Sequence, residues 1–133
     1  IKPDSILNKI SKSLPPLERA YALQRKGAKV GFDWQDSIDV ICKIEEEIKE
    51  LREAISEKSK EKVEEECGDL LFSIVNILRY INVDPVLALN KTNNKFLFRF
   101  QFIEKKFKEN GLELSKDNFM EMEKYWQEAK DLD

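Results

Sequence analysis

Two short acidic clusters in this 133-residue chain have the residue types and the spacing of a metal site. In the first cluster, Glu47 and Glu50 are three residues apart. In the second, Glu66 and Asp69 have the same spacing. Residues three apart share one face of a helix, and four converging carboxylates repel one another unless a cation lies between them. Mg²⁺ prefers oxygen ligands and often joins carboxylates to substrate phosphates, so the clusters predict metal-dependent phosphate chemistry.

Amphipathic patterns predict that the two clusters lie on consecutive helices. The first helix begins after Asp36, a plausible N-cap, and carries an apolar stripe with spacings of three and four residues. The second helix starts near Lys60, after a polar turn over residues 56–60. A short turn favours an antiparallel hairpin in which the acidic flanks face each other. The stripe of the first helix consists of Ile41, Ile44, Ile48, Leu51 and Ile55.

The remaining segments also have helical patterns, and none alternates as a half-buried strand does. The predicted fold is all-α, with the antiparallel helical hairpin at the core of a helical bundle. Residues 1–15 are interpreted as a lead-in segment and residues 16–133 as one domain. The predicted helices cover about residues 16–30, 36–55, 60–82, 84–109 and 116–130. Gly31 is expected to end the first helix, and Asp117 is a candidate cap for the last. The fourth helix is either continuous or broken near Asn90–Asn94.

Composition and charge exclude several classes of function. The net charge is −3, which gives no general attraction to nucleic acid or to anionic membranes. No apolar run approaches the roughly 20 residues of a membrane span, and no signal peptide is visible. Cys42 and Cys67 fall in helical segments and look like reduced thiols, so we expect a cytoplasmic chain. Because the chain begins with Ile1 and not methionine, we also expect it to be part of a longer protein.

The second hairpin helix is apolar on nearly all sides except for one polar seam. A helix of this kind is buried on several sides, and one small domain can hardly cover it. We therefore expect a homodimer that completes the bundle, and a monomer with this helix at its own centre is the alternative. The seam consists of Glu66, Asp69, Ser73, Asn76 and Tyr80.

Two further pairs of residues have the spacing of one helix face. Lys95 and Arg99 are four residues apart, as are Trp126 and Lys130. Lys95 and Arg99 could bind a polyphosphate through their positive charges, and Trp126 could offer an aromatic surface to a base. The alternative is that Lys95 and Arg99 serve only solubility and that Trp126 serves only core packing. Asn76 and Tyr80 could recognise a base edge or be ordinary buried polar residues. Lys43, beside the first acidic cluster, is interpreted as a solubilising residue.

Together these motifs resemble the MazG family of nucleoside triphosphate pyrophosphohydrolases, and in particular the C-terminal domain of its members. The resemblance covers roughly the whole chain, and its GFDW and EExGDLLF motifs are not generic helix sequences. The matching segments are Ser13–Leu17, Ala20-Tyr21, Val30–Trp34, the EExxE cluster at Glu46–Glu50, Glu65–Phe72, Val75-Asn76, Asn93, Lys95-Phe96, Arg99-Phe100 and Trp126–Lys130.

The resemblance implies Mg²⁺-dependent hydrolysis of nucleoside triphosphates to monophosphate and pyrophosphate by a homodimer, with Mn²⁺ as a substitute metal. It implies that Glu47, Glu50, Glu66 and Asp69 are the metal ligands, and that Glu46 is the extra acid of the motif. It further implies that Lys95, Arg99, Trp126 and Lys130 bind the triphosphate and nucleotide. A non-catalytic nucleotide-binding or dimerisation module is the alternative, and Mg²⁺-dependent release of pyrophosphate distinguishes the two.

Overall fold

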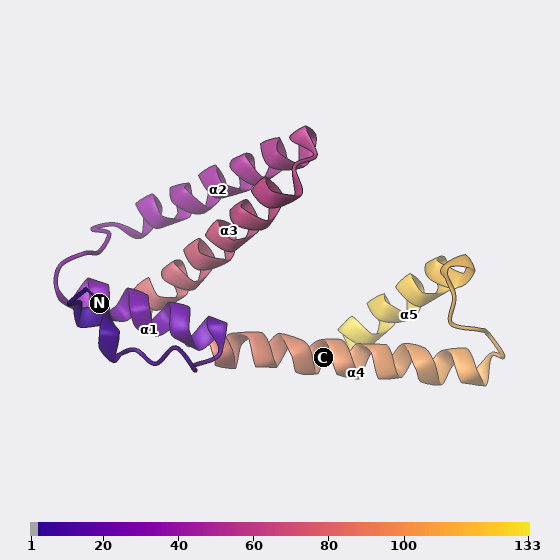
Figure 1. The fold of residues 1–133 in the computed structure, drawn as a ribbon. Helices are drawn as coiled ribbons and strands as arrows, with labels where there is room; N and C mark the ends of the chain where they lie inside the picture. Colours follow the sequence, from indigo (N-terminus) through magenta and orange to yellow (C-terminus); the bar gives the residue numbers. More distant parts are fainter. Residues whose placement is uncertain (1–2) are drawn as a thin grey trace. The chain divides into compact units, whose positions relative to one another are not determined.

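The computed structural model describes residues 3–133, and its regular elements in that range are all helical, which confirms the all-α prediction (Figure 1). The chain divides into two compact units, of which unit 1 ends at Val86 and unit 2 is Leu87–Asp133. The elements are the 3₁₀ turn η1 (Ile6–Lys9) and the helices α1 (Pro16–Lys29), α2 (Ser37–Glu57), α3 (Lys60–Tyr80) and α4 (Pro85–Glu109), followed by the 3₁₀ turn η2 (Lys116–Asn118) and helix α5 (Phe119–Asp131).

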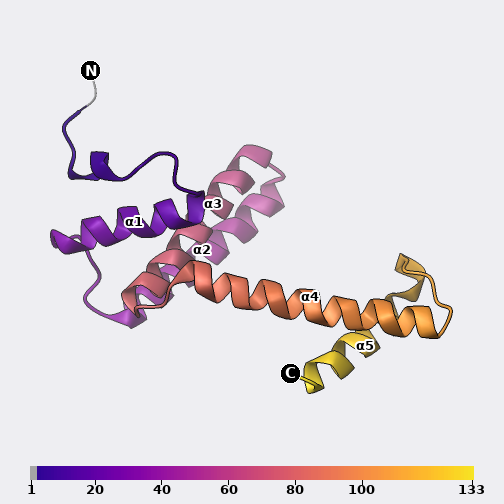
Figure 2. The same ribbon diagram turned by 90° about the horizontal axis from the view of Figure 1, so that it is seen from below.

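Helices α2 and α3 form the predicted antiparallel hairpin (Figures 1 and 2). Asp36 caps α2 as predicted, because its side chain accepts the N–H of Ile38 at 2.9 Å. The turn is shorter than the predicted 56–60 segment, since α2 continues to Glu57. Lys58 ends the helix with a left-handed φ of 58°, and the Ser59 hydroxyl then caps α3.

The buried face of α2 coincides only in part with the apolar stripe seen in the sequence, because Ile44 and Leu51 are half-buried and the other members of the stripe are exposed. Val40, Glu47 and Ala54 are the buried residues of α2, and their seven-residue spacing corresponds to about two helical turns. Ile48 and Ile55 remain 43 % and 58 % exposed. Glu47 therefore lies inside the hairpin interface, which is an unusual place for a carboxylate.

Helix α1 packs against α3 within unit 1 (Figure 2). The connector between α1 and α2, residues 30–36, is joined to the end of α3 by an ion pair. Gly31 has a φ of 101°, which ends α1 as predicted. Arg79 then donates two hydrogen bonds to the carboxylate of Asp33, from Nη1 at 3.2 Å and from Nη2 at 2.6 Å. This fork holds the connector against α3.

We expect Asp33→Asn to lower the free energy of unfolding at neutral pH by about 1–2 kcal/mol, because it leaves the largely buried guanidinium of Arg79 without its negatively charged partner. The hydrogen bond from Arg79 holds the pKa of Asp33 below its usual 3.8. The stabilisation is therefore present above that pH and is lost as the pH falls through the lower pKa of the folded protein. Urea unfolding should show a difference between variant and parent at pH 7 that disappears in strong acid. Asp4→Asn, at an exposed aspartate, is the matched control.

Unit 2 contains most of α4 together with η2 and α5. The break considered near Asn90–Asn94 is absent, and α4 is one continuous helix, because asparagine disfavours a helix only mildly. Asn110 and Gly111 end it as predicted, with a φ of 63° at the glycine. The prediction that Asp117 caps the last helix was wrong, because Asp117 lies inside η2 and α5 starts at Phe119. Phe107 and Ala129 are buried between these elements.

No single helix in residues 3–133 is both long enough and apolar enough to cross a membrane. The consecutive helices α3 and α4 meet that length and composition test only as a bent pair.

Candidate functional site

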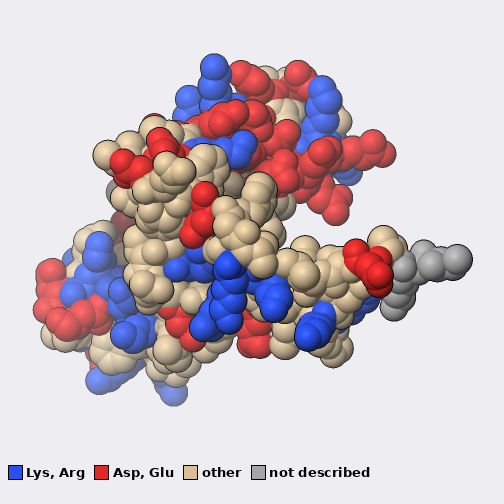
Figure 3. All heavy atoms as spheres, turned by 90° about the vertical axis from the view of Figure 1, so that its left-hand side faces the viewer, with Lys and Arg blue, Asp and Glu red and all other residues tan. Residues whose placement is uncertain are grey.

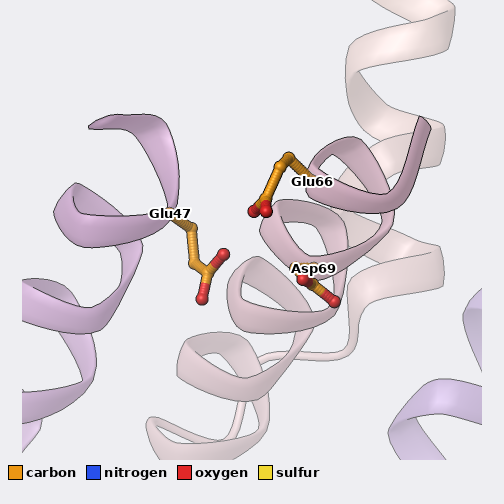
Figure 4. A group of neighbouring side chains, drawn as sticks. All are labelled: Glu47, Glu66 and Asp69. Atoms are coloured by element: carbon orange, nitrogen blue, oxygen red, sulfur yellow. The ribbon is translucent and has the colours of Figure 1, made fainter. Parts of the chain in front are cut away.

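The α2–α3 hairpin brings three of the predicted metal ligands together. Glu47 comes from α2, and Glu66 and Asp69 come from α3 (Figure 4). Each offers one carboxylate oxygen, and these oxygens all lie within 4.8 Å of one another. Acidic side chains gather over the hairpin in the upper part of Figure 3, with lysine and arginine interspersed. The arrangement has the oxygen chemistry of a divalent-cation site.

The burial of Glu47 distinguishes this group from an ordinary acidic surface, although Asp69 is exposed and Glu66 is half-buried. Glu47 is only 4 % exposed, and its Oε2 is buried without a hydrogen-bond partner. Oε2 of Glu66 is also buried without a partner. A buried, unpartnered carboxylate oxygen is costly, so native proteins pair such atoms or use them as metal ligands. The residues present therefore fit a cation bound by this group of three carboxylates.

Lys43 contacts the other oxygen of Glu47. Its Nζ lies 3.0 Å from Oε1 of Glu47 and 3.6 Å from the carboxylate of Glu46. The hydrogen bond with Glu47 raises the pKa of Lys43, so the lysine stays charged. Lys43 is interpreted from the sequence as a solubilising residue, but its i, i+4 spacing from Glu47 is a signal for this contact. Lys43 thus pairs with Oε1 of Glu47, and Oε2 of Glu47 remains without a partner.

Glu50 lies beside the three carboxylates and experiences their charge. Burial and the neighbouring negative charges of Glu47 and Glu66 raise the pKa of Glu50 to about 7. A carboxyl group in this state is partly protonated at neutral pH when no cation is near. Glu46, in contrast, is exposed and turned toward Lys43. The predicted acids thus have three different environments. Glu47, Glu66 and Asp69 converge, Glu50 lies beside them with a raised pKa, and Glu46 lies outside the group.

The raised pKa of Glu50 makes the stability of the metal-free protein pH-dependent. The folded protein holds the Glu50 proton more tightly than the unfolded chain, so this contribution is complete below the usual pKa of 4.5 and is lost as the pH rises through about 7. We expect urea unfolding in the presence of EDTA to give a midpoint that falls between pH 5 and pH 8. Glu50→Gln should flatten that dependence, whereas Glu53→Gln, on the exposed side of α2, should retain it. An unchanged slope in Glu50→Gln would show that another group is responsible.

The predicted nucleotide-binding residues of α4 and α5 lie in unit 2. The Arg99 guanidinium carbon lies 5.2 Å from the centre of the Trp126 ring, and Phe96 contacts the same ring at 5.6 Å. Arg99 Nε also donates to the carboxylate of Asp133 at 2.9 Å. Lys95 and Lys130 are exposed, each one helical turn from Arg99 or Trp126. Unit 2 therefore holds a cationic and aromatic group, and the acidic cluster belongs to unit 1.

Asn76 and Tyr80, the two other predicted binding residues, both contact Arg79. The Oδ1 of Asn76 accepts hydrogen bonds from Nε of Arg79 at 3.1 Å and from Nη2 at 2.9 Å. The Arg79 guanidinium lies 5.9 Å from the centre of the Tyr80 ring. Arg79 therefore occupies the acceptor end of the Asn76 carboxamide, and only the amide nitrogen of Asn76 can serve another partner.

Comparison of the sequence with known proteins places this chain in a family. A family model described as the MazG nucleotide pyrophosphohydrolase domain matches residues 31–100. The chain is 44 % identical over 129 residues to a Thermotoga maritima protein named nucleoside triphosphate pyrophosphohydrolase/pyrophosphatase MazG. It is 41 % identical over 130 residues to the nucleoside triphosphate pyrophosphohydrolase of Escherichia coli K12. A Bacillus subtilis protein, uncharacterized protein YabN, is 44 % identical over 128 residues.

These alignments cover 97 %, 95 % and 96 % of this chain, but 49 %, 49 % and 26 % of the three relatives. The chain thus spans about half the length of the first two curated relatives it matches. The family model covers residues 31–100, a segment that contains the connector, the α2–α3 hairpin with all five predicted acids, and the first part of α4. The chain therefore belongs to the MazG nucleotide pyrophosphohydrolase family.

Proposed function

We propose that this protein hydrolyses nucleoside triphosphates to nucleoside monophosphates and pyrophosphate in a reaction that depends on Mg²⁺. The observation that carries the proposal is the buried Oε2 of Glu47, which has no partner and lies in a group of three carboxylates. A cation satisfies that oxygen, and the oxygen donor set suits Mg²⁺ or Mn²⁺. The names of the Thermotoga and Escherichia relatives support the substrate class.

Four residues of unit 1 would hold the metal. Glu47, Glu66 and Asp69 supply the oxygens that already converge, and Glu50 loses its proton when a cation approaches. Bound Mg²⁺ would supply charge neutralisation of the triphosphate and a water of lowered pKa. Glu46 is exposed beside this group and is the candidate for accepting a proton from the attacking water.

Cationic residues of unit 2 would bind the phosphates. Arg99 offers a planar fork of donors, and Trp126 and Asp133 keep that fork oriented. Lys95 and Lys130 are exposed and would add charge stabilisation to the leaving pyrophosphate. In this proposal Trp126 acts mainly through its contact with Arg99.

Product analysis tests the proposal. Ribonucleoside and deoxyribonucleoside triphosphates would be incubated with the protein, with Mg²⁺ or with EDTA, and the products separated by ion exchange. Monophosphate and pyrophosphate that form only with metal are the expected result. Diphosphate and phosphate would mean that a different phosphoanhydride bond is cut. Nucleotide binding without turnover would favour the non-catalytic module instead.

We further propose that the protein forms a homodimer through the α2–α3 hairpin. Unit 1 leaves large apolar side chains of both helices exposed, among them Ile55 at 58 % and Leu71 at 63 %. A second copy would remove such side chains from water, and two-fold homodimers are the commonest soluble oligomers. Sedimentation should give twice the chain mass of 15.6 kDa, and Leu71→Glu should shift it toward the monomer. Met120→Glu, at a 78 % exposed position of α5, should leave the dimer intact.

A further inference from the structure

The guanidinium of Arg99 is held on two sides by residues of unit 2. The ring of Trp126 lies against it, with the guanidinium carbon 5.2 Å from the ring centre. A single oxygen of Asp133, Oδ2, accepts hydrogen bonds from both Nε and Nη2 of Arg99. Phe96 in turn packs on Trp126, with 5.6 Å between the ring centres. The guanidinium therefore has a fixed orientation, although arginine has a long and flexible side chain.

Asp133 occupies only one edge of the Arg99 guanidinium. Arginine has five N–H donors, and Asp133 accepts from one on Nε and one on Nη2. Within residues 3–133, the two N–H groups of Nη1 and the second N–H group of Nη2 have no hydrogen-bond partner. These donors form the end of the guanidinium, which can bind two oxygens of one phosphate. Asp133 and a phosphate can therefore bind Arg99 at the same time.

Binding to the same guanidinium brings two negative groups close together. The side chain of Arg99 is 15 % exposed and that of Asp133 is 29 % exposed, so water screens their charges only in part. Lys95, Arg99 and Lys130 supply three positive charges in this part of unit 2, and Asp133 offsets one of them. A phosphate bound at Arg99 is therefore repelled by the carboxylate on the other edge.

This repulsion has its main consequence for the product. In the proposed reaction, the same three cations stabilise the pyrophosphate as it leaves, and an anion held by three cations dissociates slowly. A carboxylate on the far edge of Arg99 keeps the donors in place for the reaction and weakens the binding of the released pyrophosphate. Orientation alone would not require the charge, because asparagine also accepts hydrogen bonds from arginine.

We infer that Asp133 is a positioning residue that presents one edge of Arg99 to the phosphates and that its negative charge promotes the release of pyrophosphate. The inference rests on the proposed function for the identity of the anion. It concerns the affinity for pyrophosphate, which can be measured without turnover.

Binding of pyrophosphate can be followed by NMR next to Arg99 itself. The chain has only two tryptophans, and the ring of Trp126 lies against Arg99, so its indole N–H signal reports on this site. The folded parent and Asp133→Asn would each be titrated with pyrophosphate in Mg²⁺, and the shift of the Trp126 signal gives the dissociation constant. Asparagine keeps the size of the side chain and an acceptor for Arg99, so the substitution removes mainly the charge. We expect Asp133→Asn to bind pyrophosphate about fivefold more tightly.

Salt and a matched control distinguish an effect of charge from a structural effect. The difference between the two proteins should shrink as the salt concentration rises from about 0.05 M to about 0.5 M, because ions screen the repulsion. Glu104→Gln removes a negative charge from an exposed position of α4 and should leave the affinity within about twofold of the parent value. Unchanged or weaker binding in folded Asp133→Asn would overturn the inference. A gain that Glu104→Gln reproduces, or that persists in full at high salt, would overturn it as well.

Kinetics give an independent check. Pyrophosphate should inhibit the hydrolysis of nucleoside triphosphates by Asp133→Asn with a Ki about fivefold lower than for the parent protein. The outcome is separable from that of the proposed function. If no triphosphate is hydrolysed and Asp133→Asn still binds pyrophosphate more tightly, the role of Asp133 stands and the reaction is wrong. If triphosphates are hydrolysed and the affinity for pyrophosphate does not change, the reaction stands and Asp133 has only a structural role.

Discussion

Replacing Glu47 with glutamine is expected to lower the turnover of nucleoside triphosphates by about 10³-fold or more while the protein remains folded. The substitution keeps the shape of the side chain and removes the charge at the centre of the carboxylate group. A neutral amide is a much poorer ligand for Mg²⁺ than a carboxylate. The loss should appear in kcat and should not be recovered at high nucleotide concentration.

Metal binding provides the second readout for this variant. In the parent protein, Mg²⁺ or Mn²⁺ should raise the thermal midpoint, because a ligand that binds only the folded state stabilises it. Glu47→Gln should lose most of that rise, and circular dichroism should show that its helices are intact. Glu53→Gln is the matched control, because Glu53 lies on the exposed side of the same helix. Full turnover in Glu47→Gln would remove the basis for the proposed metal centre.

Replacing Arg99 with methionine is expected to lower kcat/KM by about 10²-fold, through loss of the donors that stabilise phosphate charge. Methionine keeps an unbranched side chain that can still pack on Trp126, so the change removes mainly the charge. Asp133 also loses its partner, but its side chain is 29 % exposed and reaches water, so the fold of unit 2 should survive.

Steady-state kinetics with a control on the same helix would test this prediction. Lys105→Met removes a positive charge from an exposed position of α4 and should leave kcat/KM within about twofold of the parent value. If Arg99→Met behaved like Lys105→Met, the Arg99–Trp126–Asp133 group would have only a structural role. Reduced activity in both variants would instead indicate a general effect of the charge of α4.

Local sequence patterns were sufficient to predict the helices. Asp36 and Ser59 cap helices because their short side chains accept backbone N–H groups, and Gly31 and Gly111 end helices because they tolerate a positive φ. These effects act over a few residues, so they can be recognised without the fold. The spacing of the acidic residues is equally local, and it identified the group that Glu47, Glu66 and Asp69 form.

Two local interpretations failed, for related reasons. The considered break near Asn90–Asn94 is absent, because a weak helix propensity is easily overcome within a long helix. Asp117 has the residue type of a cap, but the preceding chain forms a 3₁₀ turn and moves the start of α5 to Phe119. Propensity alone does not determine which of several adjacent polar residues becomes the cap.

The sequence by itself thus determined the helical elements, the family motifs and the residues able to hold a metal. Only the tertiary structure decided which of those residues are buried and what they contact. The packing of α2 against α3 buries Glu47 and leaves Ile48 and Ile55 of the apolar stripe exposed. The fork between Arg79 and Asp33, 46 residues apart, depends on α1 and the connector meeting α3. Such contacts form between residues far apart in the chain, so no local sequence pattern predicts them.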